Sequence, residues 1–325
     1  MNGIQRVFES PSTSKFKPNY IMTNQTNNPT SEAIFNQTLE LLDSTGLNWS
    51  VTKEPLLTAD GKASETFGIY RSDTNQWLGS VGNQYAPMQN STLAETIVMA
   101  SQGVDCNTNR GGTLQGGKRV YIQSELPLEH IGNSDIKRWI TALTSHDGSS
   151  ATGFGSSSTV VICQNTFHMA MKDLAKFRHT ASADERVRLA SEDLNKALLT
   201  DNQLMTTFKR MADLKIGEEV IENVIRRIFT IDIKQTRSSE VSAVKKAQVT
   251  AFADSLQTEV NSHGQTLWAL FNGVTRYTNH VAAPKGDEAK DTYLMIGGGH
   301  KTNLLGFDEC MKWLEGNSKQ VYSMA

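Results

Sequence analysis

The strongest constraint on the fold is a change in hydrophobic pattern part-way along the 325-residue chain. Up to about residue 178, short runs alternate between apolar and polar residues, and turn-forming clusters such as Ala59-Asp60-Gly61-Lys62 separate them. From about Ser182 onward, apolar residues recur every three to four positions, with many charges between them. Alternation is typical of half-buried strands, and the longer spacing is typical of amphipathic helices. The sequence therefore predicts an α+β fold, with an antiparallel β-meander and flanking helices in the N-terminal half and a helical C-terminal half.

The individual elements follow from this pattern and from local start and stop signals. We expect a first helix that begins at Thr30 or Ser31, either of which can cap it, and that ends at Gly46. Strands are expected over residues 49–53, 67–71, 77–81, 139–144 and 159–163, and a hairpin over residues 106–126. Further helices are expected over residues 87–100, 165–176, 184–212, 217–229, 238–263, 265–279 and 304–314, with residues 284–301 as a loop.

Composition divides the chain into three regions. Residues 1–30 are rich in Asn, Ser, Thr, Pro and Lys, so they bury too little apolar surface to offset the entropy of ordering. We expect this stretch to be a flexible arm. Residues 31–180 are expected to form an α+β core domain, and residues 181–325 a mostly helical region.

Charge and cysteine content exclude several classes of protein. The formal net charge is -2, so binding to nucleic acid requires a local basic surface. Cys106, Cys163 and Cys310 are odd in number and form no CxxC pair, and we find no HxxxH or HExxH spacing. We therefore expect no disulfide framework, no metal site and no cofactor. No window reaches the roughly 18 consecutive apolar residues of a membrane span. We expect a cytoplasmic protein that does not bind membranes.

The tip of the expected hairpin carries a glycine-rich, basic segment over residues 110–119. It nearly matches the P-loop pattern GxxxxGK[ST]. However, Arg119 replaces the hydroxyl residue that binds magnesium, and the next residues alternate like a strand instead of opening a helix. Glycines allow backbone amides to approach phosphate closely, and no acidic residue lies between positions 107 and 124. The residues predicted to contact nucleic-acid phosphate here are Arg110, Lys118 and Arg119. The alternative is a solvated hairpin with ordinary surface charges.

Residues 144–151 form the densest polar stretch of the chain. His146 and Asp147 can orient a general base, and the neighbouring serines can act as nucleophiles. No GxSxG elbow is present, however, and serine-rich stretches are common in turns. We therefore assign no catalytic residue and predict that His146 hydrogen-bonds to nucleic acid. A hydrogen-bonded turn, or a nuclease or hydrolase site, remains an alternative.

A second basic segment follows the apolar run that ends at Cys163. The N-terminus of the helix expected over residues 165–176 favours an anion, and its lysines are four residues apart on one face. The predicted phosphate contacts are Lys172, Lys176 and Arg178, and Asn165 is predicted to hydrogen-bond to nucleic acid. The alternative is a solvated helix face, since Asp173 lies among these cations. Cys163 can be a nucleophile near His168, although a buried inert thiol is commoner at the end of an apolar strand.

Several of these segments together resemble a known family. The matching segments are Gly46-Leu47-Asn48-Trp49 with Thr58-Ala59-Asp60-Gly61, residues 78–90, residues 116–121, residues 145–151 and residues 161–166, with weaker matches at His179-Thr180, Leu267-Trp268, Val274-Thr275 and Tyr277. The chain resembles the phage/plasmid-like proteins of domain of unknown function 932. The resemblance implies a mobile-element protein in the cytoplasm of a host cell and brings no settled activity. The expected order of elements also looks like that of phage single-strand annealing proteins, the Erf-type and Rad fifty-two-type recombination mediators.

Three classes of function remain open. The first is binding or annealing of single-stranded DNA during replication or recombination, with the predicted cations in one basic strip and the protein as a homo-oligomer. In this class, bases of the DNA stack on exposed aromatic side chains. The alternative for these side chains is packing in the core. The candidates are Trp49, Tyr70, Trp77 and Tyr85. The second is a nuclease or hydrolase, in which His146, Asp147 and Cys163 converge in a cleft. The third is an anti-defence protein that binds another protein through a large apolar patch.

Overall fold

The computed structural model of the chain describes residues 31–102, 104–160, 166–168, 183–231 and 241–323. Its strands form two antiparallel sheets. The smaller sheet contains β1 (Val51–Leu57), β2 (Ala63–Arg71) and β3 (Trp77–Gly82). The larger sheet contains β4 (Asn107–Leu114), β5 (Arg119–Ile131), β6 (Ser134–Ser145), β7 (Gly153–Val160) and β8 (Thr166–His168). Each strand pairs with the next in the sequence, so both sheets are meanders.

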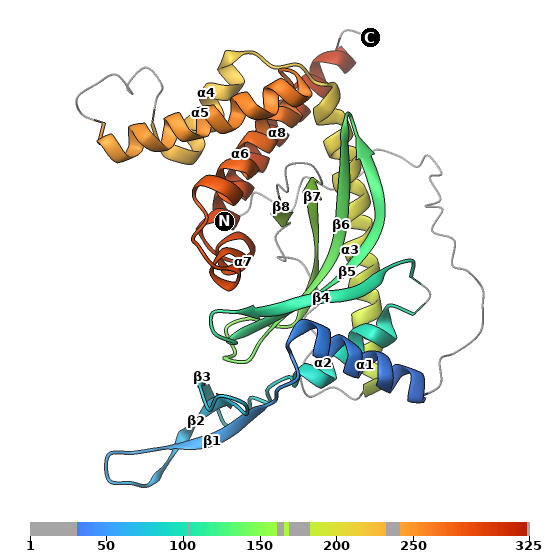
Figure 1. Ribbon diagram of the computed structural model, residues 1–325, viewed down its shortest axis with the longest axis vertical. Coiled ribbons are helices and arrows are strands. Elements are labelled where there is room, and N and C mark those ends of the chain that lie inside the picture. Colours follow the sequence, from blue (N-terminus) through green and yellow to red (C-terminus); the bar gives the residue numbers. More distant parts are fainter. Residues whose placement is uncertain (1–30, 103, 161–165, 169–182, 232–240, 324–325) are drawn as a thin grey trace.

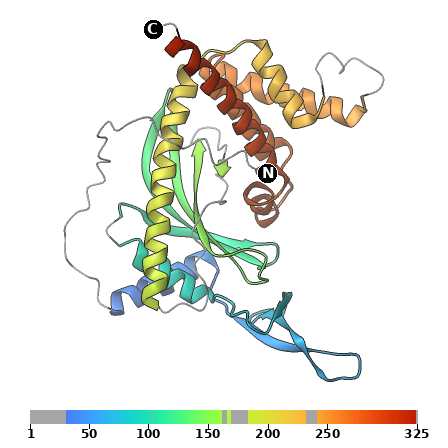
Figure 2. The ribbon, with the colours of Figure 1, turned by 180° about the vertical axis from the view of Figure 1, so that it is seen from behind.

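Some of the helices lie against the larger sheet, and the others form a separate group beyond it (Figure 1). Near one end of the sheet lie α1 (Ser31–Thr45) and α2 (Asn90–Ala100), and the long α3 (Ala183–Asp213) runs along its back, as Figure 2 shows. The helical group contains α4 (Glu218–Phe229), α5 (Ala243–His263), α6 (Leu267–Arg276), the π-helical turn η2 (Tyr277–Val281), α7 (Asp287–Met295) and α8 (Gly298–Ser323).

Helix α3 belongs to two hydrophobic cores. At 1.5 Å per residue its 31 residues span about 46 Å, long enough to reach from one core to the other. Its first half packs with α1, α2 and the sheets through Ala190, Leu194, Ala197 and Leu198. Its second half packs with α4, α5, α6 and α8 through Leu204, Met205, Phe208 and Met211. The two halves of the chain therefore share one structural element.

Burial along β6 shows where the larger sheet is covered. From Ser134 to Arg138 buried and exposed residues alternate, as expected for a strand with one face in solvent. From Trp139 to Ser145 every residue is buried, so both faces are covered over this part of the strand. The covered part ends in the loop that carries His146 and pairs with the beginning of β5, at the β4–β5 turn.

The smaller sheet projects from the rest of the molecule (Figure 1). Its β2–β3 hairpin closes through a hydrogen bond from the Arg71 amide to the Gln76 carbonyl, 3.0 Å. Asn75 takes a left-handed backbone conformation in this turn, at φ 55°. Asn tolerates that conformation better than most residues. The base of the sheet enters the first core through Val51, Ile69 and Leu78. The β2–β3 hairpin lies next to the β4–β5 turn, where a Cβ atom on Gly116 would lie 2.7 Å from Nε2 of Gln76.

The structure confirms the predicted fold class and corrects two local predictions. Residues 284–301 are not a loop, because they contain α7 and the beginning of α8. Thr166 to His168 form strand β8 and not the beginning of a helix. The predicted division near residue 180 lies outside the described residues, and the three-region division stays a prediction. Among the described residues, no helix combines the length and apolar character needed to cross a membrane.

Candidate nucleic-acid interface

The β4–β5 turn and the polar loop after β6 lie side by side. Arg119, the first residue of β5, pairs with Ser145, the last residue of β6. The amide of His146 donates to the carbonyl of Lys118 at 2.8 Å. The guanidinium of Arg119 donates to the hydroxyl of Ser149, with Nη2 and Oγ 3.2 Å apart. Strand pairing therefore joins two of the three segments in which we predicted contacts to nucleic acid.

An exposed tryptophan from the smaller sheet borders the same turn. Trp77 begins β3 and is 50 % exposed. The ammonium of Lys118 lies 5.6 Å from the centroid of its ring, within the range of a cation–π contact. Within the described part of the chain, the ion pairs include neither Lys118 nor Arg119. Both side chains are half-buried beside this aromatic surface.

Arg71 connects the smaller sheet to the turn. Its guanidinium lies 4.1 Å from the centroid of the Trp49 ring and pairs with Asp73 at 2.7 Å. Gly117 has φ 91°, and a Cβ atom there would lie 2.9 Å from Nη1 of Arg71. Only a glycine fits both the backbone conformation and this close approach. Trp49 is buried, so it packs in the core and offers no stacking surface.

Arg110 lies apart from Lys118 and Arg119. It sits on β4 opposite Gln123, and its guanidinium lies 5.3 Å from the centroid of the Trp139 ring. Four residues of strand separate it from the end of β4, a distance of about 13 Å at 3.3 Å per residue. The structure therefore groups two of the three predicted tip cations and places the third along the face of the sheet.

His146 is in the interior and not on the surface of its loop. It is fully buried, and its ring makes an edge contact with Trp49 at 5.2 Å. Its Nε2 atom lies 3.0 Å from Oδ1 of Asn90. The amide nitrogen of Asn90 donates to the carbonyls of Leu47 and Trp49, so its oxygen must accept, and Nε2 of His146 must carry the hydrogen. This bond ties the loop to the beginning of α2, and we leave His146 out of the proposed interface.

The carboxylate of Asp147 is used within its own loop. Oδ1 accepts a hydrogen bond from the amide of Ser149 at 2.9 Å, which closes a turn of the kind that Asp commonly forms. Tyr85 donates to the carbonyl of Ser145 at 3.0 Å, and burial raises its pKa to about 12. This geometry is that of a hydrogen-bonded turn.

The remaining predicted contacts belong to the segment that follows β7. Asn165, Lys172, Lys176 and Arg178 lie outside the described residues, and so does Cys163. The convergence of Lys172 with Arg119, and of Cys163 with His146, therefore stays a prediction. In the part of the chain that the structure describes, no group of His, Cys, Asp and Glu residues is arranged to hold a metal ion.

Acidic residues of α7 reach the β4–β5 turn, which local sequence did not predict. The amide of Gly116 donates to Oε1 of Glu288 at 2.5 Å, and the hydroxyl of Tyr121 donates to Oδ2 of Asp291 at 2.6 Å. Burial and the nearby Asp291 carboxylate raise the pKa of Tyr121. The acids that neighbour the turn therefore come from about 170 positions further along the chain, in a segment expected to be a loop.

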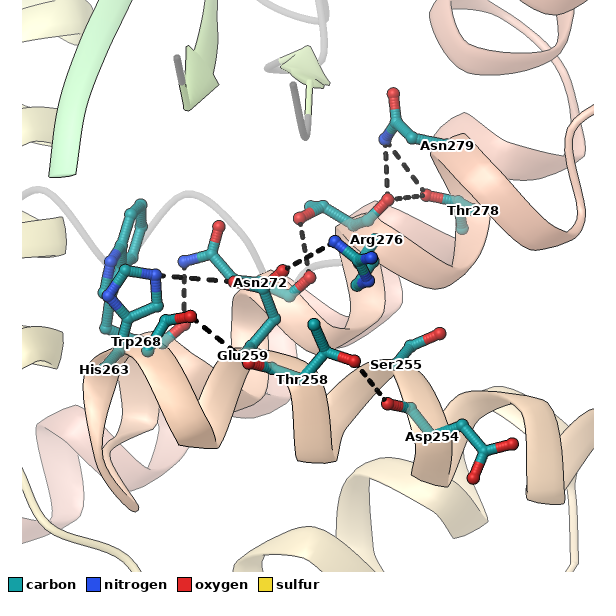
Figure 3. Close-up of polar contacts among 12 residues, drawn as sticks. Asp254, Ser255, Thr258, Glu259, His263, Trp268, Asn272, Arg276, Thr278 and Asn279 are labelled. Atoms are coloured by element: carbon teal, nitrogen blue, oxygen red, sulfur yellow. Dashed lines mark hydrogen bonds and ion pairs between the residues drawn. The ribbon is translucent and has the colours of Figure 1, made fainter. Parts of the chain in front are cut away.

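A second polar cluster lies in the helical group (Figure 3). The buried carboxylate of Glu259 on α5 pairs with His263 at 3.4 Å and with Arg276 on α6 at 3.5 Å. Asn272 donates to the carbonyl of Trp268, and Asn279 donates to that of Thr275. Most of these bonds are made to the helix backbone or between the two helices. The cluster joins α5 to α6 and does not present a group of reactive side chains to solvent.

Comparison with known proteins identifies the family. Residues 77–295 match the profile of the family described as "Domain of unknown function (DUF932)". The chain belongs to the DUF932 family. The DUF932 match begins at Trp77 and ends at Met295, so it contains the β4–β5 turn, the loop after β6 and α7. It does not extend to residues 46–49, where a further resemblance was expected. No curated protein and no solved structure matches the chain.

Proposed function

We propose that this DUF932 protein binds single-stranded DNA during replication or recombination of a mobile element such as a phage or plasmid. The supporting observation is the pairing of half-exposed Trp77 with Lys118, beside Arg119. Aromatic faces stack on bases of any sequence, and cations beside them follow the phosphate backbone. In this proposal Trp77 stacks on a base, and Lys118 and Arg119 contact the adjacent phosphates.

The charge of the whole chain favours a local site of this kind. A net charge of -2 gives no long-range attraction for DNA, so affinity must come from a few cations on one surface. The loop geometry gives the nuclease or hydrolase alternative no support, because His146 is buried and Asp147 binds its own loop. The anti-defence alternative, in which the protein binds another protein, stays a prediction.

Substitution of Trp77 tests the stacking contact. We expect Trp77→Ala to weaken binding to a labelled strand of about 40 nucleotides by about fivefold to 150-fold, because one base–aromatic stack contributes about 1–3 kcal/mol. Trp77→Phe should retain most of the affinity, since it keeps an aromatic face. Fluorescence anisotropy at low salt measures both. If the unsubstituted protein binds no strand at low salt, the proposal fails.

Substitution of Lys118 tests the phosphate contact. Lys118→Gln should lower the slope of log affinity against log salt concentration by about 0.7, the value for one phosphate contact on a single strand. Lys62→Gln is the matched control, because Lys62 lies in the β1–β2 turn, is 81 % exposed and carries the same charge. Equal effects of the two substitutions would remove Lys118 from the interface.

Annealing is a separate step that binding does not guarantee. We expect the protein to accelerate pairing of two complementary strands, measured by the quenching of a fluorophore on one strand by a group on the other. Trp77→Ala should remove most of the acceleration at protein concentrations that saturate neither strand. Binding without acceleration would limit the function to single-strand binding.

A further inference from the structure

The amides at the tip of the β4–β5 turn point toward α7. Three successive residues of the turn have positive φ: Gln115 at 55°, Gly116 at 70° and Gly117 at 91°. The amides of Gly117 and Lys118 bond within the turn, to Leu114 and Gln115. The amides of Gln115 and Gly116 instead donate to Thr292 Oγ1 at 3.3 Å and to Glu288 Oε1 at 2.5 Å.

Backbone amides that point out of a turn in this way can bind an anion. Successive backbone N–H groups in a turn form a concave surface that binds anions, and a bond to a charged acceptor is shorter and stronger than a neutral one. The short bond from Gly116 to the Glu288 carboxylate has this character. Lys118 and Arg119 follow directly in the chain, so the tip carries two positive charges next to the amides of Gln115 and Gly116. The Glu288 carboxylate occupies the position that a phosphate oxygen would take.

Helix α7 also contacts the sheet away from the tip, and it packs on α8. Its Asp291 bonds to Tyr121, and Met295 and Ile296 pack on Leu114, Tyr121 and Leu143. Glycines flank it on both sides, with Gly286 at φ 92° before the helix and Gly297 after it. Glu288 itself is exposed. A nine-residue helix held in this way can exchange its contact at the tip for a soluble anion more readily than a core helix can.

We infer that α7 is an acidic latch, which competes within the same chain with the phosphate backbone of single-stranded DNA for the amides of Gln115 and Gly116. The inference rests on the proposed function and adds its regulation. Glu288 lowers the affinity of the free protein for DNA, and binding of a strand displaces its carboxylate from Gly116. The strand that displaces it must carry a phosphate next to the base stacked on Trp77.

Removal of the Glu288 charge should therefore tighten binding. We expect Glu288→Gln to bind a labelled strand of about 40 nucleotides about threefold to tenfold more tightly, as the loss of a modest charge-assisted hydrogen bond allows. Asp287→Asn is the matched control. It lies on the same helix, is exposed and removes the same charge.

The outcomes separate the latch from the function. Tighter binding by Glu288→Gln, with Asp287→Asn close to the unsubstituted protein, supports the latch. Equal tightening by both variants makes the effect one of net charge and overturns it. Unchanged affinity of Glu288→Gln, when the unsubstituted protein binds DNA, overturns the latch and leaves the function standing. If neither protein binds DNA, the result contradicts the proposed function and, with it, the latch.

Hydrogen exchange provides a second measurement that does not depend on affinity. The amide of Gly116 should exchange slowly in the unsubstituted protein and faster in Glu288→Ala, and added single-stranded DNA should slow it again in the variant. The amide of Gly117, which bonds within the turn, should not change and reports that the hairpin is folded. Failure of DNA to protect Gly116 in a variant that binds DNA would overturn the latch.

Discussion

Arg138 and Asp201 form a buried ion pair between β6 and α3. Their side chains are 6 % and 0 % exposed, and Nη1 and Oδ2 lie 2.9 Å apart. Ser156 donates to the other carboxylate oxygen at 2.8 Å, and Nε of Arg138 donates to the carbonyl of Pro127. Burial raises the pKa of Asp201, while Arg138 and Ser156 oppose that rise. Each partner thus offsets the desolvation of the other, and loss of one leaves an uncompensated charge.

Replacement of Arg138 should therefore destabilise the protein in a pH-dependent way. We expect Arg138→Met to lower the free energy of unfolding by about 3–5 kcal/mol near pH 7.5. Without Arg138 the folded-state pKa of Asp201 rises further. A raised carboxyl pKa contributes stability that is present below the unfolded-state value and lost as pH rises through the folded-state value. The deficit should therefore be smaller near pH 4.5. Urea unfolding at both pH values measures it.

The adjacent Lys137 provides the control for this experiment. Its side chain is 46 % exposed and lies 3.7 Å from Glu125 on the other face of the sheet. Exposed pairs contribute about 0–1 kcal/mol, so Lys137→Met should be nearly neutral at both pH values. An Arg138→Met variant as stable as Lys137→Met, or one whose deficit does not change with pH, would contradict the account of the buried pair.

At the residue scale, the sequence predicted the polar character of a segment better than the position of each side chain. The basic turn and the polar loop were correctly expected to be polar segments near strand ends, since local pattern encodes strands and turns. His146 was expected at the surface, and its interior position depends on Asn90, 56 residues away. Glu288 reaches Gly116 across 172 residues. A single sequence carries no local signal for such pairings.

The contact between α5 and α6 depends on the absence of a side chain at Gly273. A Cβ atom there would lie 2.9 Å from the Cα of Leu256 and 3.2 Å from its Cβ. Atoms of the α5 backbone cannot move without shifting the whole helix. The same pair of helices carries the Glu259 cluster of Figure 3, so a shift would also strain its ion pairs.

An alanine at Gly273 should therefore destabilise the helical group. We expect Gly273→Ala to lower the free energy of unfolding by about 1–3 kcal/mol, the usual effect of overpacking a close contact. Gly316→Ala in α8 is the control, because a Cβ there meets open space. It should be neutral or stabilise the protein by up to about 1 kcal/mol through helix propensity. Equal effects of the two substitutions in urea unfolding would contradict the close packing of α5 on α6.

Elements with strong internal patterns were predictable, and elements held by tertiary contacts were not. The β4–β5 hairpin and α3 follow directly from alternation and from three-to-four spacing. Helix α7 is short, polar and flanked by glycines, and its position depends on contacts with β4 and β5 that lie far away in the sequence. Strand β8 has three residues and exists through pairing with β7. The local sequence of neither element differs clearly from that of a loop.

On the scale of the whole molecule, the sharing of α3 between the two cores links the sheet to the helical group. The smaller sheet has no such support, because it projects from the body and enters the first core only at its base (Figure 1). Strands β1 and β3 are its edges. Leu57, the last residue of β1, is 67 % exposed. Exposed edges with apolar side chains favour association with another chain.

We therefore propose that copies of the protein associate through the smaller sheet when they bind along one DNA strand. Light scattering coupled to size exclusion should give a mass above the 35.8 kDa of one chain in the presence of single-stranded DNA, after subtraction of the DNA. Nuclease treatment should lower that mass. Leu57→Ser should reduce assembly, while Leu199→Ser on α3, whose side chain is 53 % exposed, should not. A mass of one chain at every protein concentration, with or without DNA, would contradict assembly, and equal behaviour of the two variants would exclude the smaller sheet as its site.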